Sequence, residues 1–426
     1  MKARSIHPAD AIVEIMTRLY DNGLTTTSGG NLSVADDEGN LWISPSGVDK
    51  AHLKREDIMC VKRDGSVCGP HRVSTECPFH LAIRRSRPEL RAVLHAHPGA
   101  LVAFSLMRKI PDLNIIPGVA SLCGKISMAK YALPGSSRLG GFIADEFAKG
   151  YDTVILENHG VVIGAESLER AYMMLEELEF CARIQLGASA LGRGCRTLSE
   201  SQLKAAEAMS RYEPKFPPSP SDTEIRAELI ALIRRSCEHK LTSSGNGVIA
   251  ARLPGGGFVI TPYDEDNRLL EPDDLVWVRG EECEKGKTPS REAGFIAKIF
   301  DAHPDIQSVI VARPPEIMSF AVGDAGFDSR LIPESYICLK EINRFPFGVR
   351  QNNPELIVDK ISMKNPIAIV ENDAVVVAGS SPLNAFDRLE VMEFGAYSLR
   401  QITQHSGDIV RISDGEIREI EVEFKL

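Results

Sequence analysis

Three histidines are the residues of this sequence whose spacing best fits shared chemistry. His95 and His97 stand two positions apart at the end of an apolar run that we expect to form a strand. Alternate side chains of a strand point to the same face, so both imidazoles would lie on one side of a sheet. His159 follows another apolar run, and Gly160 beside it permits a sharp turn.

The chemistry that fits this set is metal binding. Three neutral imidazoles on a rigid sheet edge, with one coordination position left open, match a catalytic zinc site better than a structural one. Ligand type alone leaves cobalt, manganese and iron open as alternatives. A His-x-His pair taken alone is usually a half-buried surface feature, so the prediction depends on His159 and on the repeat described below.

Glu76 is the candidate proton carrier. It begins a predicted helix that ends before Pro88, and Ser74 is the expected N-cap of that helix. One interpretation makes Glu76 a general acid/base beside a metal-bound substrate. The other makes it a first-turn carboxylate that complements the helix dipole. Both stay open on spacing alone, because Glu292 occupies the equivalent place in the second half of the chain.

The chain is a tandem repeat. Residues 87–98, which contain the histidine pair, align with residues 303–314 at an offset of 216. Residues 157–162 align with 371–376 at an offset of 214. The second half keeps this frame but replaces all three histidines together, with Val311, Arg313 and Asp373. When all three histidines are replaced while the surrounding sequence is retained, the pattern is that of a lost metal site.

The repeat sets the predicted domains. Four prolines within residues 212–221 are too many for a helix or a central strand, and they predict a stiff, extended linker. We therefore expect a domain with an intact metal site over 1–211, a linker over 212–221, and a degenerate domain without metal ligands over 222–426.

Both halves show helical and strand patterns. Helices are expected over 9–20 and 224–235, where apolar residues recur at helical spacing. Strands are expected over 41–44, 92–95 and 153–156, and over 258–261, 308–311 and 367–370 in the second half. Each half is therefore predicted to be a mixed α/β domain with a central sheet covered by helices.

Composition narrows the function classes. The 426 residues carry 49 Lys and Arg against 59 Asp and Glu, a net charge of −10. That sign disfavours a nucleic-acid binder or a binder of anionic membranes, and no apolar run is long enough to span a bilayer. Nine scattered cysteines without a C-x-x-C pair predict a reduced, cytoplasmic protein.

The first half resembles the class II aldolase/adducin family over about residues 9–190, and the second half resembles it over about 224–405 without the metal ligands. Five motifs occur in the order and rough spacing of the family: Gly30-Asn-x-Ser33, Ser44-Pro-Ser-Gly47, Ser74-x-Glu76, His95-x-His97-Pro and Asn158-His-Gly160. The resemblance implies two tandem α/β/α three-layer sandwich domains, with zinc held by His95, His97 and His159.

The resemblance also implies an activity. Glu76 would be the acid/base residue of a zinc-dependent aldolase that cleaves or forms a C–C bond in a small phosphorylated ketose, with the metal stabilising the enediolate. The implied phosphate pocket is formed by Ser28, Gly30, Asn31, Ser46, Gly47, Ser74 and Thr75. The turns that carry these residues could each present backbone N–H groups to a phosphate, although each alone is an ordinary turn.

Alternatives to an aldolase remain. Pro117 stands where fuculose-phosphate aldolases have a tyrosine that handles the aldehyde oxygen. A zinc-dependent dehydratase or decarboxylase shares the metal ligands and Glu76, whereas a non-catalytic adducin-like binding module would not need them. Family enzymes are four-fold tetramers, so a tandem chain is expected to form a homodimer with pseudo-four-fold symmetry, or a higher homo-oligomer. The expected partner is a small carbonyl compound or sugar phosphate.

Overall fold

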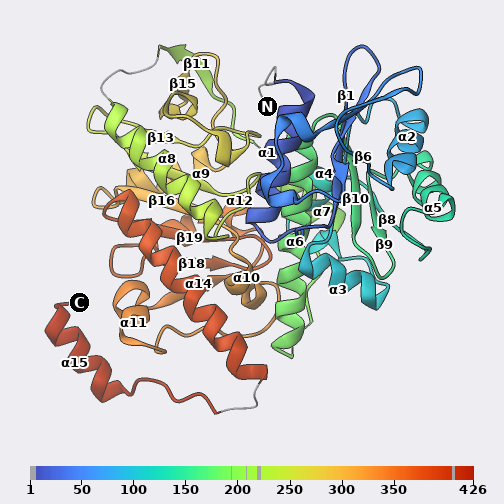
Figure 1. Ribbon diagram of the computed structural model, residues 1–426. Helices are drawn as coiled ribbons and strands as arrows, with labels where there is room; N and C mark the ends of the chain where they lie inside the picture. The colour runs from blue at the N-terminus through green and yellow to red at the C-terminus, as the bar shows by residue number, and fades with distance from the viewer. Residues whose placement is uncertain (1–5, 193, 208, 218–221, 405–407) are drawn as a thin grey trace. The chain divides into compact units, whose positions relative to one another are not determined.

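The computed structural model describes residues 6–192, 194–207, 209–217, 222–404 and 408–426. The chain divides into two compact units. The N-terminal unit contains Lys2–Leu113 and Val119–Ala182, and the C-terminal unit contains Asn114–Gly118 and Arg183–Leu426. Figure 1 shows a central sheet with helices in each unit.

The sheet of the N-terminal unit has eight strands within the described residues. In spatial order they are β5 Val67–Cys68, β4 Met59–Val61, β2 Leu41–Ile43, β1 Asn31–Ala35, β7 Ala92–Ala96, β10 Val161–Ala165, β9 Thr153–Leu156 and β8 Ile126–Ala129. All neighbours are antiparallel except β8 and β9. A separate small ladder joins β3 Pro45–Ser46 to β6 Arg72–Val73.

The sheet of the C-terminal unit repeats this order with one strand added at an edge. Its described strands, in spatial order, are β11 Glu213–Phe216, β15 Glu282–Glu284, β14 Val276–Arg279, β13 Phe258–Ile260, β12 Val248–Arg252, β16 Ser308–Ala312, β19 Ala374–Gly379, β18 Ile367–Val370 and β17 Ile342–Phe345. The strands β17 and β18 pair parallel, as their counterparts β8 and β9 do in the first sheet.

Strand register confirms the duplication. Asn31 and Val162 flank His95 in the first sheet, and Val248 and Val376 flank Val311 in the second. Register therefore makes Val248 the counterpart of Asn31. The second copy thus has an apolar side chain where the first has the amide of Asn31.

Helices lie against both faces of each sheet. Those before the second copy are α1 Pro8–Asp21, α2 Cys77–Ser86, α3 Gly99–Met107, α4 Val119–Cys123, α5 Ser137–Ala148, α6 Leu168–Ala190 and α7 Glu200–Ala206, with short 3-10 turns η1 Lys50–His52, η2 Arg55–Asp57 and η3 Leu113–Ile115. Figure 1 shows α2 and α5 on one side of the first sheet and α1 and α6 on the other.

The second copy contains the remaining helices. They are α8 Thr223–Glu238, α9 Ala293–Ala302, α10 Pro315–Ala321, α11 Pro333–Leu339, α12 Val349–Asn352, α13 Glu355–Val358, α14 Pro382–Gln404 and α15 Asp414–Phe424, with 3-10 turns η5 Asn267–Leu269 and η6 Pro272–Asp274. Helix α14 packs against α8, β16 and β19.

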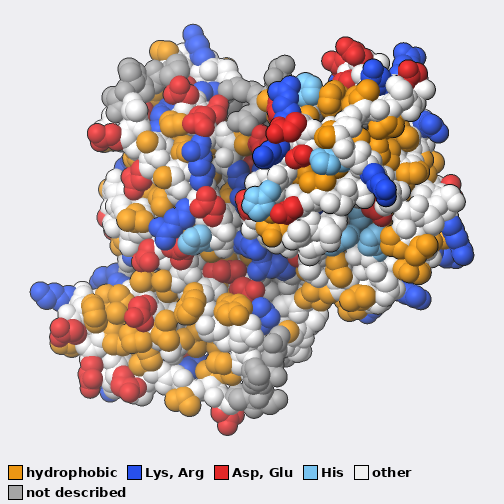
Figure 2. Space-filling view, in the orientation of Figure 1, with side chains coloured by type: hydrophobic (Ala, Val, Ile, Leu, Met, Phe, Trp, Pro, Cys, Tyr) orange, Lys and Arg blue, Asp and Glu red, His pale blue; other side chains and the backbone are white. Residues whose placement is uncertain are grey.

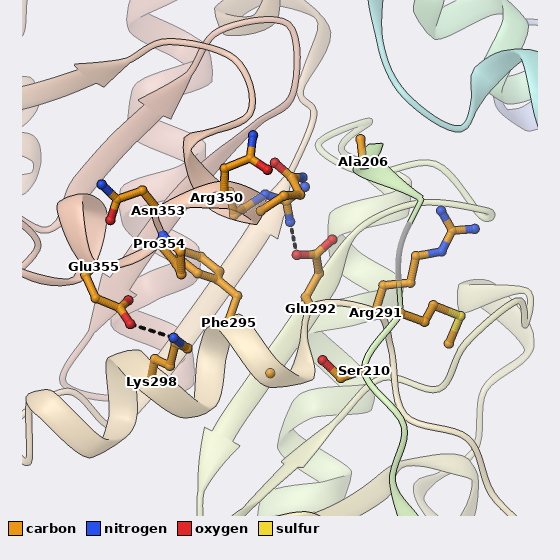
Figure 3. A pocket seen from close by; sticks show the side chains of 14 residues that line it. Ala206, Ser210, Arg291, Glu292, Phe295, Lys298, Arg350, Asn353, Pro354 and Glu355 are labelled. Atoms are coloured by element: carbon orange, nitrogen blue, oxygen red, sulfur yellow. Dashed lines mark hydrogen bonds and ion pairs between the residues drawn. The ribbon is translucent and has the colours of Figure 1, made fainter. Parts of the chain in front are cut away.

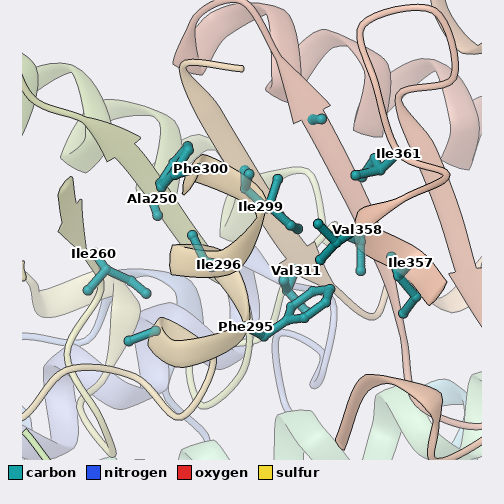
Figure 4. Packing of buried hydrophobic residues seen from close by; sticks show 14 of the residues in the cluster. Ala250, Ile260, Phe295, Ile296, Ile299, Phe300, Val311, Ile357, Val358 and Ile361 are labelled. Atoms are coloured by element: carbon teal, nitrogen blue, oxygen red, sulfur yellow. The ribbon is translucent and has the colours of Figure 1, made fainter. Parts of the chain in front are cut away.

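The core of the C-terminal unit shows how period-2 patterning builds the layers. Val309 and Val311 of β16 belong to the same buried cluster as Ile296, Ile299 and Phe300 of α9. Figure 4 shows Val311 on the side of the sheet that α9 covers. Because β16 is buried along its whole length, the other strand face must also be covered, which explains its continuous apolar sequence. Each such fully buried side chain contributes about 1.5–3 kcal/mol of hydrophobic stabilisation.

The predicted helices and strands are confirmed, with changes at two ends. Ser74 and Ser290 are not the N-caps of α2 and α9, because Glu76 and Glu292 occupy those positions. Each serine hydroxyl instead accepts a hydrogen bond from the backbone N–H of the glutamate two residues on. The serine side chain thus stabilises the turn before each helix, and each helix begins closer to the C-terminus than predicted.

The segment predicted as a linker, 212–221, is partly built into the second sheet. Glu213–Phe216 forms the edge strand β11, which pairs parallel with β15. Pro214 is tolerated there because an edge strand needs hydrogen bonds on one side only. Residues 218–221 of the predicted linker lie outside the described residues.

Surface and cysteine chemistry agree with the composition. Figure 2 shows acidic and basic side chains interspersed over the face in view. All nine cysteines are free thiols, six of them buried. None of the described helices combines the length and apolarity needed to cross a bilayer.

Candidate metal centre

The strand β7 and the β9–β10 turn bring the three histidines together in the N-terminal unit. His95 is the fourth residue of β7, between β1 and β10, and His97 follows the end of that strand. His159 lies in the turn that returns β9 antiparallel into β10. Because β10 pairs with β7, this turn is held against the end of β7 where the histidine pair stands.

The imidazoles converge closely enough to share one ion. One ring nitrogen from each of His95, His97 and His159 lies within 4.8 Å of the others, and the Nε2 atoms of His95 and His97 are 3.1 Å apart. Zinc–nitrogen bonds of about 2.0–2.1 Å in tetrahedral geometry place ligand nitrogens about 3.3 Å apart. Among the described residues, this is the one cluster of histidine, cysteine or carboxylate side chains with metal-binding spacing.

Burial keeps these imidazoles neutral, which leaves a lone pair for a metal. Desolvation, with a smaller effect from the neighbouring His159, lowers the pKa of His95 to about 3. Desolvation and the adjacent His95 lower the pKa of His97 to about 3. The pKa of His159 is also lowered by burial. The Nδ1 atom of His95 lies 2.9 Å from the carbonyl oxygen of Val161, so Nδ1–H donates there and Nε2 faces the other histidines.

Glu76 completes the cluster from the start of α2. Its Oε2 lies 3.4 Å from Nε2 of His95 and accepts a hydrogen bond of 2.6 Å from Nδ2 of Asn31. Its Oε1 and the Nδ1 of His159 are buried without a hydrogen-bond partner among the described residues. A buried carboxylate oxygen and imidazole nitrogen of this kind are costly unless a cation or a substrate group satisfies them. The residues therefore fit a divalent metal site.

A fourth histidine, which sequence reasoning did not identify, positions this carboxylate. His80 of α2 is fully buried; its Nε2 lies 2.5 Å from Oδ1 of Asn31, and its Nδ1 lies 2.7 Å from Oγ of Ser33. Since the amide nitrogen of Asn31 donates to Glu76, its Oδ1 must accept from Nε2–H of His80. The hydrogen bonds thus run from Ser33 through His80 and Asn31 to Glu76.

The repeat contains a signal that could have revealed this chain of hydrogen bonds. The second copy carries Ile296, Val248 and Ala250 at the positions of His80, Asn31 and Ser33, as strand register and the 216-residue offset show. The same fold therefore accommodates apolar residues at all three positions. The polar residues of the first copy are not required by the fold, which indicates that they serve Glu76.

Glycines allow the backbone to approach the histidines. A Cβ atom on Gly160 would lie 2.5 Å from the carbonyl oxygen of Ala96 and 2.6 Å from Cδ2 of His97. One on Gly30 would lie 2.6 Å from the carbonyl oxygen of His95. The sharp turn itself was wrongly attributed to Gly160: the left-handed residue is Asn158, with φ of 55°, and Gly160 is needed for space.

The predicted phosphate-binding residues come from three turns that the structure links together. The β3–β6 ladder places Ser46 opposite Arg72, two residues before Ser74, and the backbone N–H of Lys50 donates to the carbonyl oxygen of Thr27 beside Ser28. Gly30 and Gly47 have φ of 69° and 71°, a conformation that favours glycine. Thr75 is exposed, and its side chain lies beside Gly135.

Two side chains near these turns have roles other than direct phosphate binding. The side chain of Asn31 is committed to Glu76 and His80, so only its backbone could meet a phosphate. Lys50, which sequence reasoning missed, is buried and donates to the carbonyl oxygen of Pro45 at 2.5 Å. Burial lowers the pKa of Lys50 to about 8.

Comparison with known proteins shows which family this chain belongs to. The sequence profile of the Class II Aldolase and Adducin N-terminal domain matches residues 10–186 and again 227–398. The chain belongs to this family. Its fold is two tandem class II aldolase domains, and each match ends within the helix, α6 or α14, that follows the last central strand of its copy.

Three relatives each match about half of this chain and most of their own length. A 3-oxo-tetronate 4-phosphate decarboxylase of Pectobacterium atrosepticum is 33% identical over 41% of this chain and 81% of its own length. A 5-deoxy-D-ribulose 1-phosphate aldolase of Bacillus thuringiensis is 30% identical over 49% of this chain and 94% of its own. A solved L-fuculose 1-phosphate aldolase is 30% identical, with a TM-score of 0.43 over 47% of this chain and 94% of that one.

Proposed function

We propose that this protein is a zinc-dependent lyase that breaks or forms a carbon–carbon bond in a small phosphorylated sugar-like carbonyl compound. The observation that carries the proposal is the convergence of His95, His97 and His159 beside Glu76 in one copy. The equivalent positions of the other copy lack all three imidazoles. The relatives named above, two aldolases and a decarboxylase acting on sugar phosphates, support the same reaction class.

The residues of the chain divide the chemistry among them. A divalent metal held by the three histidines would supply Lewis-acid polarisation of the substrate carbonyl. Glu76 would carry the proton, because its Oε2 is fixed by Asn31 while its buried Oε1 has no partner among the described residues. The turns at 28–31, 44–47 and 74–75 would hold the phosphate through backbone N–H groups and hydroxyls.

Aldol cleavage and decarboxylation share the step assigned to Glu76. In either reaction a carbon–carbon bond breaks, its electron pair stays on the carbon next to the carbonyl, and that carbon must be protonated. The reactions differ in the other fragment, which leaves as an aldehyde or as carbon dioxide. Two observations favour decarboxylation as the second candidate: the similarity to the Pectobacterium enzyme, and Pro117 where fuculose-phosphate aldolases have tyrosine.

Product analysis after metal analysis tests the proposal. We expect about one zinc per chain, and release of an aldehyde from 5-deoxyribulose 1-phosphate or of carbon dioxide from 3-oxo-tetronate 4-phosphate. Protein that stays metal-free when zinc is supplied would contradict the lyase and favour an adducin-like binding module.

The role of Glu76 has its own test. Glu76→Gln should keep zinc while slowing turnover at least 100-fold, since general acid–base catalysis contributes about 10²–10⁴. The matched control is Glu89→Gln, which alters an exposed carboxylate of the same unit that pairs with Arg87. An unchanged rate in Glu76→Gln would return that residue to the helix-dipole role.

We also propose that two chains form a homodimer in which four domains take the places of four subunits. The two aldolase domains per chain support this arrangement. Light scattering should give twice the chain mass of 46.6 kDa, and a monomer would contradict it.

A further inference from the structure

The C-terminal unit contains a polar pocket of about 580 Å³ beside the position of the lost site. Its walls come from the start of α9, from α12 and α13, and from residues after α7 (Figure 3). Glu292, the counterpart of Glu76, is among the lining residues. A cavity of this size is in the range of small-molecule sites.

A guanidinium group that lines this pocket, that of Arg350, lies between the counterparts of two residues of the first site. Arg350 donates from Nε and Nη2 to both carboxylate oxygens of Asp373, at 2.9 and 2.6 Å, and also pairs with Glu292. Asp373 and Glu292 are the counterparts of His159 and Glu76. The second copy thus has a fixed positive charge between the two positions that flank the metal site in the first.

The space itself arises from a shortened element. In the N-terminal unit the twelve-residue helix α5 packs on α2, which carries Glu76. In the C-terminal unit the corresponding chain forms two four-residue helices, α12 and α13, and α13 packs on α9. Two short helices cannot cover the area of α5, so the first turns of α9 remain open beside Arg291 and Glu292.

The charges that line the pocket favour an anion. The carboxylates of Glu292 and Asp373 are balanced by the guanidinium groups of Arg350 and Arg313. Lys298 and Glu355 form an ion pair at 2.6 Å, so they add no net charge (Figure 3). Arg291 has no carboxylate partner among the described residues. Its guanidinium lies 5.1 Å from the ring centroid of Tyr263 and donates to the phenol oxygen at 3.0 Å, which leaves further N–H groups to donate.

Amide groups add neutral donors to the same wall. Gln351, Asn352 and Asn353 line the pocket next to Arg350. The Oε1 atom of Gln351 is buried without a hydrogen-bond partner among the described residues, although its Nε2 lies 3.3 Å from Asp373. A hydroxyl group of a ligand would satisfy that oxygen.

We propose that this pocket binds a small phosphorylated, hydroxyl-bearing molecule, with Arg291 as its main phosphate contact. Arginine presents several donors in a planar fork that matches phosphate geometry. The second copy has therefore exchanged a catalytic site for a ligand site. Arg291 occupies the position of Thr75 in the first copy. A positive charge at the start of a helix is unfavourable by itself, and a role in phosphate binding explains its presence there.

Calorimetric titration of the full chain with glycerol 3-phosphate, and separately with inorganic phosphate, tests this site. All titrations use the Thr75→Glu variant as background, in which the new carboxylate repels phosphate from the turns of the first copy. Any phosphate binding that remains is then measured at the second copy, whether or not the first copy has the proposed phosphate site. We expect one binding event per chain, tighter for the ester than for inorganic phosphate. Arg291→Gln in that background should weaken it at least tenfold.

The control is Arg279→Gln, because that guanidinium lies over Phe216 and Trp277 and does not line the pocket. It should bind as the Thr75→Glu background does. Absence of binding in that background, equal affinity after Arg291→Gln, or an equal loss after Arg279→Gln would each overturn the proposal. Zinc content and product release of the Arg291→Gln single variant should match the unaltered chain, which separates this site from the proposed lyase site.

Discussion

At the scale of single residues, the two copies act as a natural substitution experiment. His95 and Val311 occupy the same place in the same strand order, each buried between equivalent neighbours. Valine is among the residues that a central strand favours, whereas burying an imidazole there costs the free energy of its desolvation. Histidine at this position therefore reflects a requirement that the fold alone does not impose.

The first prediction concerns that histidine. His95→Ala should reduce bound zinc from about one per chain to less than a tenth and abolish lyase activity, because a tetrahedral site loses one of three protein ligands. Mass spectrometry of eluted metal measures the first effect. His52→Ala, which removes an exposed histidine paired with Asp49, is the control and should keep both zinc and activity. Zinc retained in full by His95→Ala would show that the ion lies elsewhere.

Sequence could predict the histidine cluster but not the residues behind it. His95 and His97 have a spacing that puts them on one strand face, and the repeat marks their loss at 311 and 313. His80 lies on the buried face of α2, where its position has the periodicity of an ordinary core residue. Nothing local distinguishes such a histidine from a packed one. Only the folded structure shows that its Nε2 contacts Oδ1 of Asn31 on β1.

At the scale of elements, the positions of the main strands and helices were predictable because apolar runs of the right length recur in both copies, whereas the order of the strands in each sheet comes from the structure. The errors lie where tertiary contacts decide. Ser74 has the composition of an N-cap, yet its hydroxyl closes the turn before Glu76, and the helix begins at Cys77. The strand β11 depends on an available partner at the edge of a sheet, which the local sequence of a proline-rich segment does not reveal.

The turn between β9 and β10 provides the second prediction. Gly160→Ala places a methyl group against Ala96 and His97, so the turn must move and carry His159 with it. We expect zinc affinity to fall at least tenfold and stability to fall by about 1–3 kcal/mol. Chelator competition and chemical denaturation measure these changes. The control, Gly141→Ala in α5, meets no atom within 4 Å and should be neutral or stabilising by up to about 1 kcal/mol.

The third prediction transfers the apolar residues of the second copy to the first. The variant Ser33→Ala/His80→Ile/Asn31→Val should fold and keep zinc, but should lose at least tenfold in turnover because Glu76 loses its hydrogen-bond partner. Enzyme assays and metal analysis of the same preparation measure these effects. Full turnover in this variant would show that Glu76 needs no support from Asn31.

The same variant should change the acid stability of the chain. Burial lowers the pKa of His80 in the folded protein to about 3, against 6.5 for an unperturbed histidine. The unfolded chain therefore binds a proton between those values that the folded chain refuses, and stability falls as pH decreases from 6.5 towards 3. Without His80 that loss, on the order of a few kcal/mol at pH 4, disappears. Circular dichroism should show acid unfolding at lower pH, and an unchanged midpoint would contradict the assigned burial.

At the scale of the whole molecule, duplication has let one chain carry two versions of one fold. The copy that keeps the metal ligands also keeps the polar residues around Glu76, and the copy that lost them has apolar residues at every one of those positions. Its charged residues at the equivalent positions are not remnants, because Arg350 and Arg313 both pair with Asp373 and Arg350 also pairs with Glu292. Replacement of the three histidines by a valine and two members of these ion pairs leaves the strand frame unchanged.

The fourth prediction follows from that replacement. Restoring the ligands with Val311→His/Arg313→His/Asp373→His should leave zinc at about one per chain, because the Arg350 guanidinium still occupies the space beside Glu292 and repels a divalent cation. Adding Arg350→Leu should raise zinc towards two per chain. An imidazole at position 311 would find the carbonyl oxygen of Val375, the counterpart of Val161, to orient it. Two zinc ions in the triple variant alone would show that Arg350 does not stand in the place of the metal.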